Sequence, residues 1–290
     1  DALEIRGKSD RNVILFINGA DQELTLFDAP DLPEDAYHLS SVLTEHFGEE
    51  NPRSISVVSS GSGARNTLMG CLNFTWYDTK RKQIRYKQAG RGGVGTVFAD
   101  KGLKAVVACW DNVTADTNAP ADKDRLKKVA KMHSREVVEL DPKQNEMAKI
   151  GTTHLVSIMS DHDLLPTHNF QYGTHREAVN LSQSVYRPIF DPGFDGCWMG
   201  CTVACSHGVR DFVPLTGPYK GRKVFVDGPE YETIYAFGGL CEIDSIEEII
   251  YLNDLCDRLG LDTISAGNLS AFAIEASQQG KIDSSIDYGD

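Results

Sequence analysis

The sequence lacks any apolar run long enough to cross a membrane as a helix, and no stretch of it resembles a signal peptide. Positive charge is also scarce, because 29 Lys and Arg face 42 Asp and Glu, which gives a net charge of -13. A chain this acidic is not expected to bind nucleic acid or an anionic membrane surface. Since internal repeats and low-complexity tracts are absent as well, the composition indicates a globular protein without membrane insertion.

The cysteines and histidines are too few and too irregularly placed to indicate a disulfide scaffold or a histidine metal site. The cysteines number 7, an odd count with uneven spacing, which disfavours a secreted disulfide scaffold. The 8 histidines show no spacing typical of metal ligands. The expected location is therefore a reducing cytoplasm.

The two ends of the sequence lack the features of natural termini. The chain begins at Asp1, without Met, and continues in the alternating pattern of a strand. It stops at Asp290, soon after a predicted helix. We therefore expect the sequence to be part of a longer protein, although 290 residues already suffice for two domains and a large core.

Hydrophobic periodicity divides the chain into two parts of different character. The first part is predicted to hold one helix over 36–47, which Gly48 ends, and strands over 13–17, 24–27, 54–59, 68–77, 83–86 and 103–110. After a polar segment with a proline, the pattern becomes helical over 123–140, from the N-cap Ser245 to Gly260, and over 269–280. The predicted class is α+β, with a β-rich domain over 1–112 and a mainly helical domain over 113–290.

Three cysteines lie close together in a segment rich in glycine. Cys197, Cys201 and Cys205 have three residues between each pair, and Gly196 and Gly200 disfavour a helix there. On a helix this spacing would place three small thiols on one packed face, which is the alternative interpretation. Thiolates on a loop are ligands for iron–sulfur clusters. The pattern therefore favours a redox cluster whose fourth ligand comes from elsewhere.

The segment from Gly90 to Gly95 matches the pattern G-x-G-x-x-G. The buried parallel strand that a dinucleotide site requires does not precede it, so this pattern does not predict a dinucleotide-binding domain. The glycine backbone together with Lys87 and Arg91 can still bind phosphate, and a tight turn without a ligand is the alternative. A second glycine pair, Gly61 and Gly63, is more typical of a simple turn.

Two acidic motifs are candidates for chemistry. Glu230 and Glu232 flank Tyr231 before an apolar segment, where a raised carboxyl pKa would suit proton transfer. A solvated pair at a helix start is the alternative. Asp257 and Asp262 bracket the turn that ends a helix, where two carboxylates can accept N–H donors from a planar ligand. An ordinary helix C-cap is the alternative there.

Six motifs in a fixed order resemble one protein family. They are Ala89–Gly95, Lys101–Val106, Asn169-Phe170-Gln171-x-Gly173, the three cysteines, Gly228–Glu232 and the segment from Asp257 to Ser265, which begins D-x-x-G-L-D. Together they resemble the tungsten-containing aldehyde:ferredoxin oxidoreductase family over nearly the whole chain. The resemblance implies that the chain covers part of the family's β-rich N-terminal domain and much of its helical second domain, without the third.

The resemblance implies a set of cofactors and the residues that hold them. It implies a tungsten or molybdenum atom on two pterins, Mg²⁺ between the pterin phosphates, and a [4Fe-4S] cluster. The phosphate and magnesium end would lie at Lys87, Gln88, Gly90 and Arg91, and the pterin ring would lie at Asp257, Leu261 and Asp262. The cluster would be held by Cys197, Cys201 and Cys205, and Glu232 would assist proton movement. The fourth cysteine and a histidine partner of Glu232 would lie beyond Asp290.

The sequence departs from the family pattern at several points. The first two cluster cysteines of the family commonly have two residues between them, whereas three lie between Cys197 and Cys201. Lys87 stands where an arginine is expected, and the hairpin over 73–87 is longer than usual. Tyr251 replaces a glutamate that binds an iron ion between subunits in some members, so that ion is not expected here.

The resemblance implies oxidation of an aldehyde to a carboxylate, or the reverse, with electrons passed to ferredoxin or an iron–sulfur subunit. The small-molecule substrate and the oligomeric state are left open. One alternative is the active-site subunit of an aromatic acyl-CoA reductase of the benzoyl-CoA type. The others are a non-catalytic iron–sulfur electron-transfer subunit and a structural zinc module.

Overall fold

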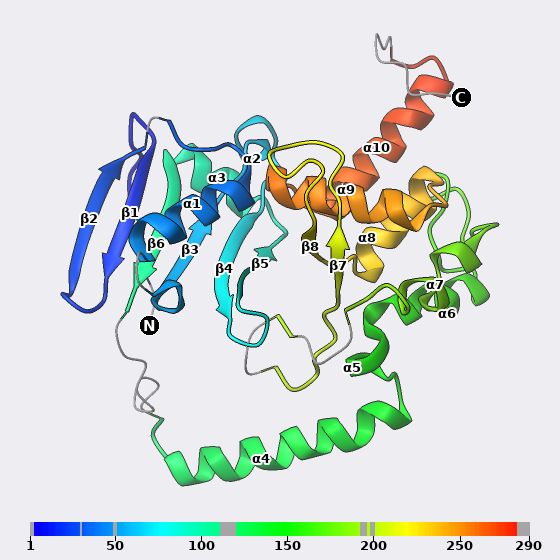
Figure 1. Ribbon diagram of the computed structural model, residues 1–290. Coiled ribbons are helices and arrows are strands. Elements are labelled where there is room, and N and C mark those ends of the chain that lie inside the picture. Colours follow the sequence, from blue (N-terminus) through cyan, green and yellow to red (C-terminus); the bar gives the residue numbers. More distant parts are fainter. Residues whose placement is uncertain are drawn as a thin grey trace. The chain divides into compact units, whose positions relative to one another are not determined.

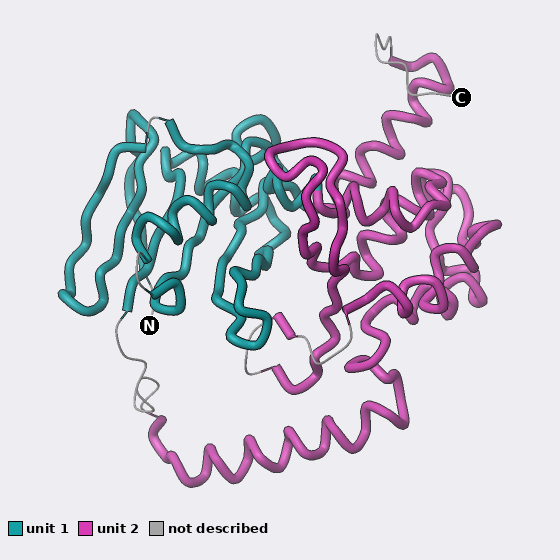
Figure 2. Tube along the Cα trace, in the orientation of Figure 1, with its two compact units in different colours: residues 1–115, 255–262 teal, residues 116–254, 263–290 magenta. Residues whose placement is uncertain are grey.

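The computed structural model describes residues 3–29, 31–48, 51–110, 120–191, 196–197 and 201–282. The chain divides into two compact units (Figure 2): unit 1 comprises residues 1–115 and 255–262, and unit 2 comprises residues 116–254 and 263–290. The predicted α+β class is confirmed, because a β-rich N-terminal region is followed by helices (Figure 1). The domain boundary predicted between residues 112 and 113 lies outside the described residues and stays a prediction.

A mixed sheet of six strands forms the framework of the described part of unit 1, in the order β2-β1-β6-β3-β4-β5. β1 and β6 run parallel, whereas the other neighbours run antiparallel. The strands are β1 (Val13–Asn18), β2 (Glu23–Asp28), β3 (Ile55–Ser59), β4 (Leu72–Asp78), β5 (Gln83–Ala89) and β6 (Leu103–Cys109). The six strands predicted over 13–110 are present, although β4 begins four residues later than predicted, because the residues before it bond to a different segment of the chain. The strand pattern at the start of the chain is wrong, because residues 3–12 form no strand.

The core of unit 1 lies between the sheet and helix α1 (Ala36–Gly48). Leu39 and Leu43, one helical turn apart, pack against Val57 of β3 and Val107 of β6, and all four are fully or almost fully buried. Burying one such side chain stabilises a fold by roughly 1.5–3 kcal/mol. The helix is therefore fixed on the sheet by its apolar face, as its sequence pattern predicts.

Two short helices connect the strands of unit 1. They are α2 (Gly63–Asn66), which follows β3, and α3 (Val94–Asp100), which follows the glycine-rich segment after β5. The strand before that segment is antiparallel to its one neighbour, β4. The arrangement therefore confirms that Gly90–Gly95 is not a dinucleotide-binding motif, because such a motif follows a parallel strand.

Unit 2 is mainly helical in its described part and carries one small hairpin, β7 (Gly208–Phe212) with β8 (Val224–Asp227). None of the helices in the described ranges has the length and apolar character that a membrane crossing requires. The last five residues of α9 already belong to unit 1. The helices are α4 (Lys123–Leu140), α5 (Met147–Ile150), α6 (Leu155–Asp161), α7 (Gln183–Tyr186), α8 (Tyr231–Ile234), α9 (Ile246–Leu259) and α10 (Thr263–Gln278), and a π-helix η5 (Tyr235–Gly239) follows α8.

The start of α10 differs from the prediction. The helix begins at Thr263, directly after Asp262, whereas the sequence pattern predicts a start at residue 269. Gly267 weakens the helical pattern, but its missing side chain allows close packing, since a Cβ there would lie 2.6 Å from the backbone carbonyl carbon of Ala236. Tertiary packing therefore overrides the low helix propensity of glycine at this position.

Candidate functional site

The turn from Asp257 to Asp262 forms backbone hydrogen bonds with the residues just before β4 in unit 1. Gly260 adopts φ +69° and ends α9, as its position in the sequence predicts. The Cys71 N–H donates to the Gly260 carbonyl at 2.8 Å, and the Asp262 N–H donates to the Met69 carbonyl at 3.0 Å. These bonds occupy the residues before β4, which is why that strand starts late.

The weaker glycine pair of the sequence, Gly61 and Gly63, makes room for this turn. A Cβ on Gly61 would collide with the backbone of Leu259, and a Cβ on Gly63 would lie 2.6 Å from the side chain of Leu261. Both glycines therefore serve a close approach of two backbones rather than a ligand. The interpretation of this pair as a structural turn agrees with the packing.

The glycine-rich loop divides into an open half and a packed half. A Cβ on Gly90 or Gly92 would meet nothing within 4 Å, whereas a Cβ on Gly95 would collide with the Cys71 backbone. Gly92 and Gly93 have φ of +84° and +70°, a backbone that favours glycine. The open half can present backbone N–H groups to an anion. Beside it, Lys87 is half-buried and Arg91 is 60% exposed.

Side-chain contacts join the loop to the turn within unit 1. The Arg91 Nε atom lies 3.9 Å from an Asp262 carboxylate oxygen. The Gln88 amide donates to the Tyr37 hydroxyl at 2.9 Å, and that hydroxyl donates to the Asp257 carboxylate at 3.1 Å. Two motifs that are far apart in the sequence therefore form one cluster of polar groups, which we call the loop–turn site.

Asn73 supports Gln88 from the neighbouring strand. Its side-chain oxygen accepts a second hydrogen bond from the Gln88 amide at 3.3 Å, and the residue is fully buried. Neither Asn73 nor Tyr37 was identified from the sequence, because each lies inside a regular strand or helix without a motif. A polar side chain at a buried position of β4 is the one signal that would have indicated Asn73.

The loop–turn site is rich in buried negative charge. Asp257 and Asp262 are 4% and 8% exposed. Burial, and after it the charges of Asp257 and Asp262, raises the pKa of the Cys71 thiol to about 12. Burial likewise raises the pKa of the Cys256 thiol. These carboxylates suit a ligand that offers N–H donors.

Among the cysteines of unit 2, Cys197 and Cys201 lie outside helices and strands, and Cys205 forms a single β-bridge. Cys197 is exposed, whereas Cys201 and Cys205 are half-buried, and residues 198–200 between them lie outside the described ranges. Burial, followed by the charges of Glu230 and Cys201, raises the pKa of the Cys205 thiol. Across the part of the chain that the structure describes, no three His, Cys, Asp or Glu side chains are arranged as a metal-binding group. The assignment of these cysteines as cluster ligands stays a prediction.

The two glutamates of the Gly228–Glu232 segment have different surroundings. The Thr152 hydroxyl donates to the Glu230 carboxylate at 2.5 Å and accepts the Tyr231 N–H at 3.0 Å. Glu232 lies half-buried in the first turn of α8. Burial, and then the charges of Tyr235 and Glu232, raises the pKa of the Tyr231 hydroxyl to about 12. The catalytic role predicted for Glu232 stays a prediction.

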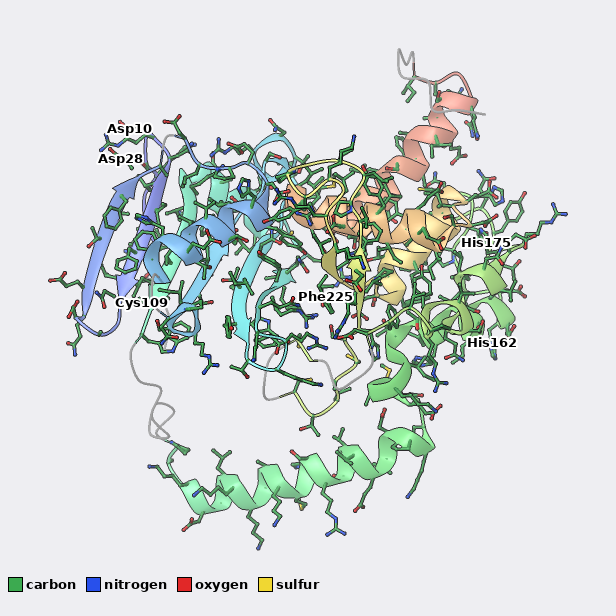
Figure 3. All side chains as sticks on the ribbon, in the orientation of Figure 1. Asp10, Asp28, Cys109, His162, His175 and Phe225 are labelled. Atoms are coloured by element: carbon green, nitrogen blue, oxygen red, sulfur yellow. The ribbon has the colours of Figure 1, made fainter. Side chains whose placement is uncertain are left out.

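Other polar features of unit 2 have structural partners. The Tyr251 hydroxyl hydrogen-bonds the Thr216 hydroxyl at 3.1 Å. His175 pairs with Asp244 at 3.2 Å, and Figure 3 marks this histidine in the helical part of the unit. Tyr251 and His175 therefore each have a polar partner within the described part of unit 2.

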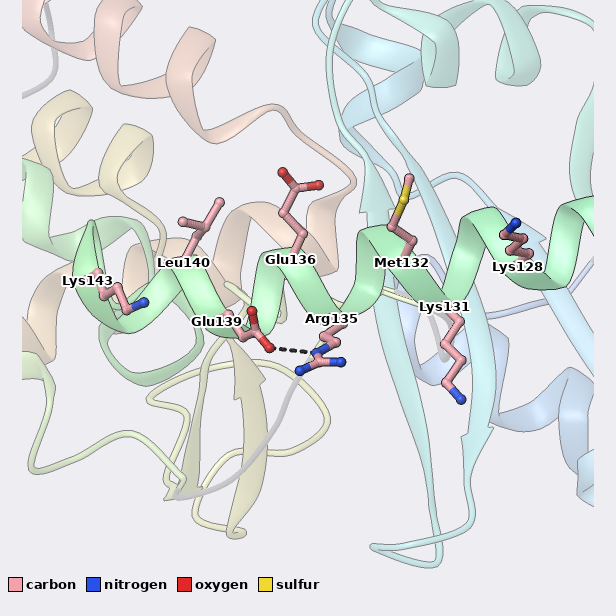
Figure 4. Close-up of a pocket in the computed structure, with 8 residues that line it drawn as sticks. All are labelled: Lys128, Lys131, Met132, Arg135, Glu136, Glu139, Leu140 and Lys143. Carbon is pink, nitrogen blue, oxygen red and sulfur yellow. Dashed lines mark hydrogen bonds and ion pairs between the residues drawn. The ribbon is translucent and has the colours of Figure 1, made fainter.

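A surface groove of about 740 Å³ follows α4 and the turn after it (Figure 4). It contains the ion pair between Arg135 and Glu139, whose closest atoms are 2.6 Å apart. Its lining is Lys128, Lys131, Met132, Arg135, Glu136, Glu139, Leu140 and Lys143. No residue singled out in the sequence lines this groove, so the loop–turn site remains the principal candidate.

Comparisons with known proteins agree with the motifs. The model of the aldehyde ferredoxin oxidoreductase N-terminal domain matches residues 1–109, and the model of domains 2 and 3 matches residues 128–290. Two similar proteins are the tungsten-containing aldehyde ferredoxin oxidoreductases of Pyrococcus furiosus and Pyrococcus horikoshii, which are 28% and 29% identical over 284 residues. Each match covers 97% of this chain and 42% of the relative.

Two further comparisons extend this result. A P. furiosus protein described as an aliphatic sulfonate oxidoreductase, WOR-like subunit, is 28% identical over an alignment of 291 positions, and the match covers 97% of this chain and 43% of that protein. The structure of the active site complex BamBC of benzoyl coenzyme A reductase has a similar fold, with a TM-score of 0.64 and 17% identity. That match covers 98% of this chain and 41% of the other. The chain thus spans about two fifths of the length of the curated relatives it matches.

Proposed function

This chain belongs to the aldehyde ferredoxin oxidoreductase family, and on that premise we propose that it forms the pterin-binding part of a tungsten-dependent oxidoreductase. The observation that carries the proposal is the loop–turn site. Arg91 with Asp262, and Gln88 through Tyr37 with Asp257, join the glycine-rich loop to the D-x-x-G-L-D turn in one compact unit. Family members use a tungsten- or molybdenum-pterin cofactor, and these two segments match the family's cofactor motifs.

The residues present fit that cofactor. The backbone at Gly90 and Gly92 has open space beside it, and the cations Lys87 and Arg91 suit phosphate groups. Backbone N–H groups would donate hydrogen bonds to phosphate groups held there, and a bound Mg²⁺ would offset the negative charge of the phosphates. Lys87 would contribute as a point charge rather than as a bidentate fork.

The turn fits the other end of the same cofactor. Asp257 and Asp262 are carboxylates that can accept hydrogen bonds from the paired N–H groups of a pterin ring, and Leu261 lies between Gly260 and Asp262 in the same turn. When bound, a tungsten (or molybdenum) bis-pterin would supply two-electron redox chemistry at a carbonyl carbon. The chain's own task at this site is to bind the cofactor and fix its orientation.

We assign proton movement to Glu232 and cluster binding to the cysteines. An aldehyde becomes a carboxylic acid by taking an oxygen atom from water and releasing two protons and two electrons. The Glu232 carboxylate would accept one of these protons, a role in which a positioned side chain contributes a rate factor of about 10²–10⁴. Cys197, Cys201 and Cys205 have the donor chemistry of a [4Fe-4S] site, with a fourth ligand from another part of the protein.

The proposed substrates are small aldehydes or carboxylic acids, and the proposed electron partner is ferredoxin or an iron–sulfur subunit. The proposed location is the cytoplasm. The names of the curated relatives support an aldehyde as the substrate and ferredoxin as the electron partner.

Elemental analysis of the anaerobically purified, full-length native protein tests the proposal. We expect near-stoichiometric tungsten or molybdenum, about four iron atoms per chain if the cluster is present, and reduction of a viologen dye that depends on an added aldehyde. Protein that contains iron without tungsten, molybdenum or pterin would contradict the proposal and indicate a non-catalytic electron-transfer subunit. Zinc alone would contradict it as well.

A second candidate keeps the cofactor and changes the substrate. The fold likeness to the benzoyl coenzyme A reductase complex, over 98% of this chain, supports an aromatic acyl-CoA as substrate. Redox assays that offer aldehydes and aromatic acyl-CoA thioesters in parallel distinguish the two candidates. Turnover of the thioester alone would favour the second candidate.

A further inference from the structure

Tyr37 lies at a well-defined place in unit 1, in the first turn of α1. Asp35 stands just before this helix and accepts the His38 N–H at 2.7 Å, which satisfies one of the free donors at the helix start. Tyr37 is 3% exposed. Its backbone is therefore held by a capped helix, and its side chain points into protein rather than into solvent.

The hydroxyl of Tyr37 connects the two halves of the loop–turn site. It accepts a hydrogen bond from the Gln88 amide at 2.9 Å and donates one to the Asp257 carboxylate at 3.1 Å. The direction of each bond follows from the chemistry, because a carboxylate can only accept and the amide NH₂ can only donate. One oxygen atom thus defines where the Gln88 amide and the Asp257 carboxylate lie relative to each other.

The ring of Tyr37 is fixed independently of its hydroxyl. It stacks on Tyr86 with 4.0 Å between centroids and 15° between planes, and the Arg258 guanidinium lies 5.0 Å from its centroid. Arg258 in turn pairs with Asp35 at 3.5 Å. Replacing the tyrosine by phenylalanine would therefore remove the hydroxyl and leave the ring in place.

Both residues that the hydroxyl contacts are among those assigned to the cofactor. Gln88 lies at the end proposed for the phosphates, and Asp257 lies at the end proposed for the pterin ring. The distance between these two anchoring points must match the length of the ligand, and small displacements in such sites weaken binding. A fixed hydrogen-bonded link between them would keep that distance constant.

We propose that Tyr37 is a positioning residue for the pterin cofactor, acting through Gln88 and Asp257 without contacting the reacting atoms. The inference rests on the proposed function. It adds a residue from α1, outside every motif of the sequence, to the residues that hold the cofactor. The ring of Tyr37 contributes to folding, and its hydroxyl sets the geometry of the site.

The test compares Tyr37→Phe with Tyr86→Phe in the full-length, anaerobically produced protein. Tyr86 is a matched control, because its ring stacks on Tyr37 while its hydroxyl bonds the Ser41 hydroxyl at 2.5 Å, and Ser41 is not among the residues assigned to the cofactor. Three quantities are measured: metal and pterin per chain, the paramagnetic resonance spectrum of the metal in the loaded fraction, and the melting temperature of the metal-free protein.

We expect Tyr37→Phe to retain several-fold less metal and pterin than Tyr86→Phe and to show a shifted metal spectrum, while both variants melt at similar temperatures. Equal cofactor content with unchanged spectra would overturn the role of Tyr37 and leave the proposed function intact. A loss of cofactor that follows the melting temperature equally in both variants would also overturn it, because the hydroxyl would then be merely structural. Wild-type protein without tungsten, molybdenum or pterin would overturn the proposed function and this inference with it.

Discussion

Gly260 and Gly61 pack backbone against backbone in unit 1: a Cβ on Gly260 would lie 2.6 Å from the Gly61 nitrogen. Gly260 ends α9 and Gly61 follows β3, so nearly 200 residues of sequence separate the two glycines. The absence of both side chains brings the D-x-x-G-L-D turn against the sheet. The loop–turn site depends on this contact.

We predict that Gly61→Ala destabilises the protein, because the added methyl group would meet the Leu259 backbone, which cannot move aside as a flexible side chain would. Overpacking of this kind costs about 1–3 kcal/mol. Denaturant titration of the wild type and the variant measures the loss. Gly90→Ala is the matched control, since its Cβ would meet nothing within 4 Å and its unfolding free energy should not change. Equal stability of Gly61→Ala and wild type would contradict the prediction.

Arg91→Gln should separate stability from cofactor retention. The Arg91 side chain is 60% exposed and its contact with Asp262 is long, at 3.9 Å. Exposed pairs contribute less than about 1 kcal/mol, so the unfolding free energy should change little. The pterin and metal content should nevertheless fall, because a cation beside the proposed phosphate position is lost. Arg6→Gln, at the exposed pair with Glu4, is the control and should affect neither quantity.

The two buried thiols of unit 1 predict a decline in stability at high pH. The pKa of Cys71 rises from 9.0 to about 12 on folding, chiefly by burial. Between these values the unfolded chain releases a thiol proton that the folded chain keeps, so stability falls as the pH rises through this window. Below pH 9 the thiol keeps its proton in both states, so the stability that depends on this proton is fully present. Denaturant midpoints measured from pH 8 to pH 11 should fall more steeply for wild type than for Cys71→Ala, and parallel curves would contradict this account.

The raised pKa values of the Cys71 and Cys256 thiols predict that these two cysteines react more slowly than exposed Cys197 in metal-free protein. Exposed Cys197 should react with iodoacetamide at pH 8, whereas Cys71 and Cys256 should react only after unfolding, because the thiolate is the nucleophile. Peptide mass mapping after a timed reaction measures each site. Rapid labelling of Cys71 in the folded protein would show that unit 1 opens locally.

Cys201→Ser should remove most of the iron from anaerobically prepared protein, since a hydroxyl is a poor ligand for an iron–sulfur cluster. Cys241→Ser is the control. The Cys241 thiol lies 3.4 Å from the Gly267 carbonyl, a contact that a serine hydroxyl can also make. Iron analysis and visible absorbance check both variants. Loss of iron in both, or in neither, would be evidence against the assignment of the cysteine loop.

Glu232→Gln should lower kcat by about 10²–10⁴ if its carboxylate moves a proton, with unchanged metal and pterin content. The amide keeps the size of the side chain and removes its basicity. Glu248→Gln, at an exposed position of α9, should leave kcat unchanged. A Glu232→Gln variant with full kcat would remove this residue from the mechanism.

Local sequence patterns predict most helices and strands but not the long-range contacts that bring the motifs together. The strands of unit 1 and helix α1 follow from alternation and helical periodicity, and Gly260 ends α9 as predicted. The bond between Tyr37 and Asp257 joins residues 220 positions apart, and no local pattern contains that information. The start of α10 was missed for a related reason, since the packing of Gly267 against Ala236 is a tertiary effect.

The candidate site was predicted residue by residue, and its assembly was not. Arg91, Asp257 and Asp262 each lie in a motif, Gln88 directly precedes one, and the structure brings all four together in unit 1. Tyr37 and Asn73 support them from elements that carry no motif. The cysteine loop and Glu232 belong to unit 2, and their roles stay predictions.

The return of residues 255–262 to unit 1 has a consequence for synthesis on the ribosome. The chain passes between the units at 115/116, 254/255 and 262/263, so unit 1 lacks one of its segments until the ribosome has passed residue 262. Until then Gly61 and the residues before β4 have no turn to pack against. A nascent chain that has emerged only to residue 115 would therefore hold all six strands but not the turn that packs against them, open to chaperones and proteases, and this unit would be completed late despite being made first.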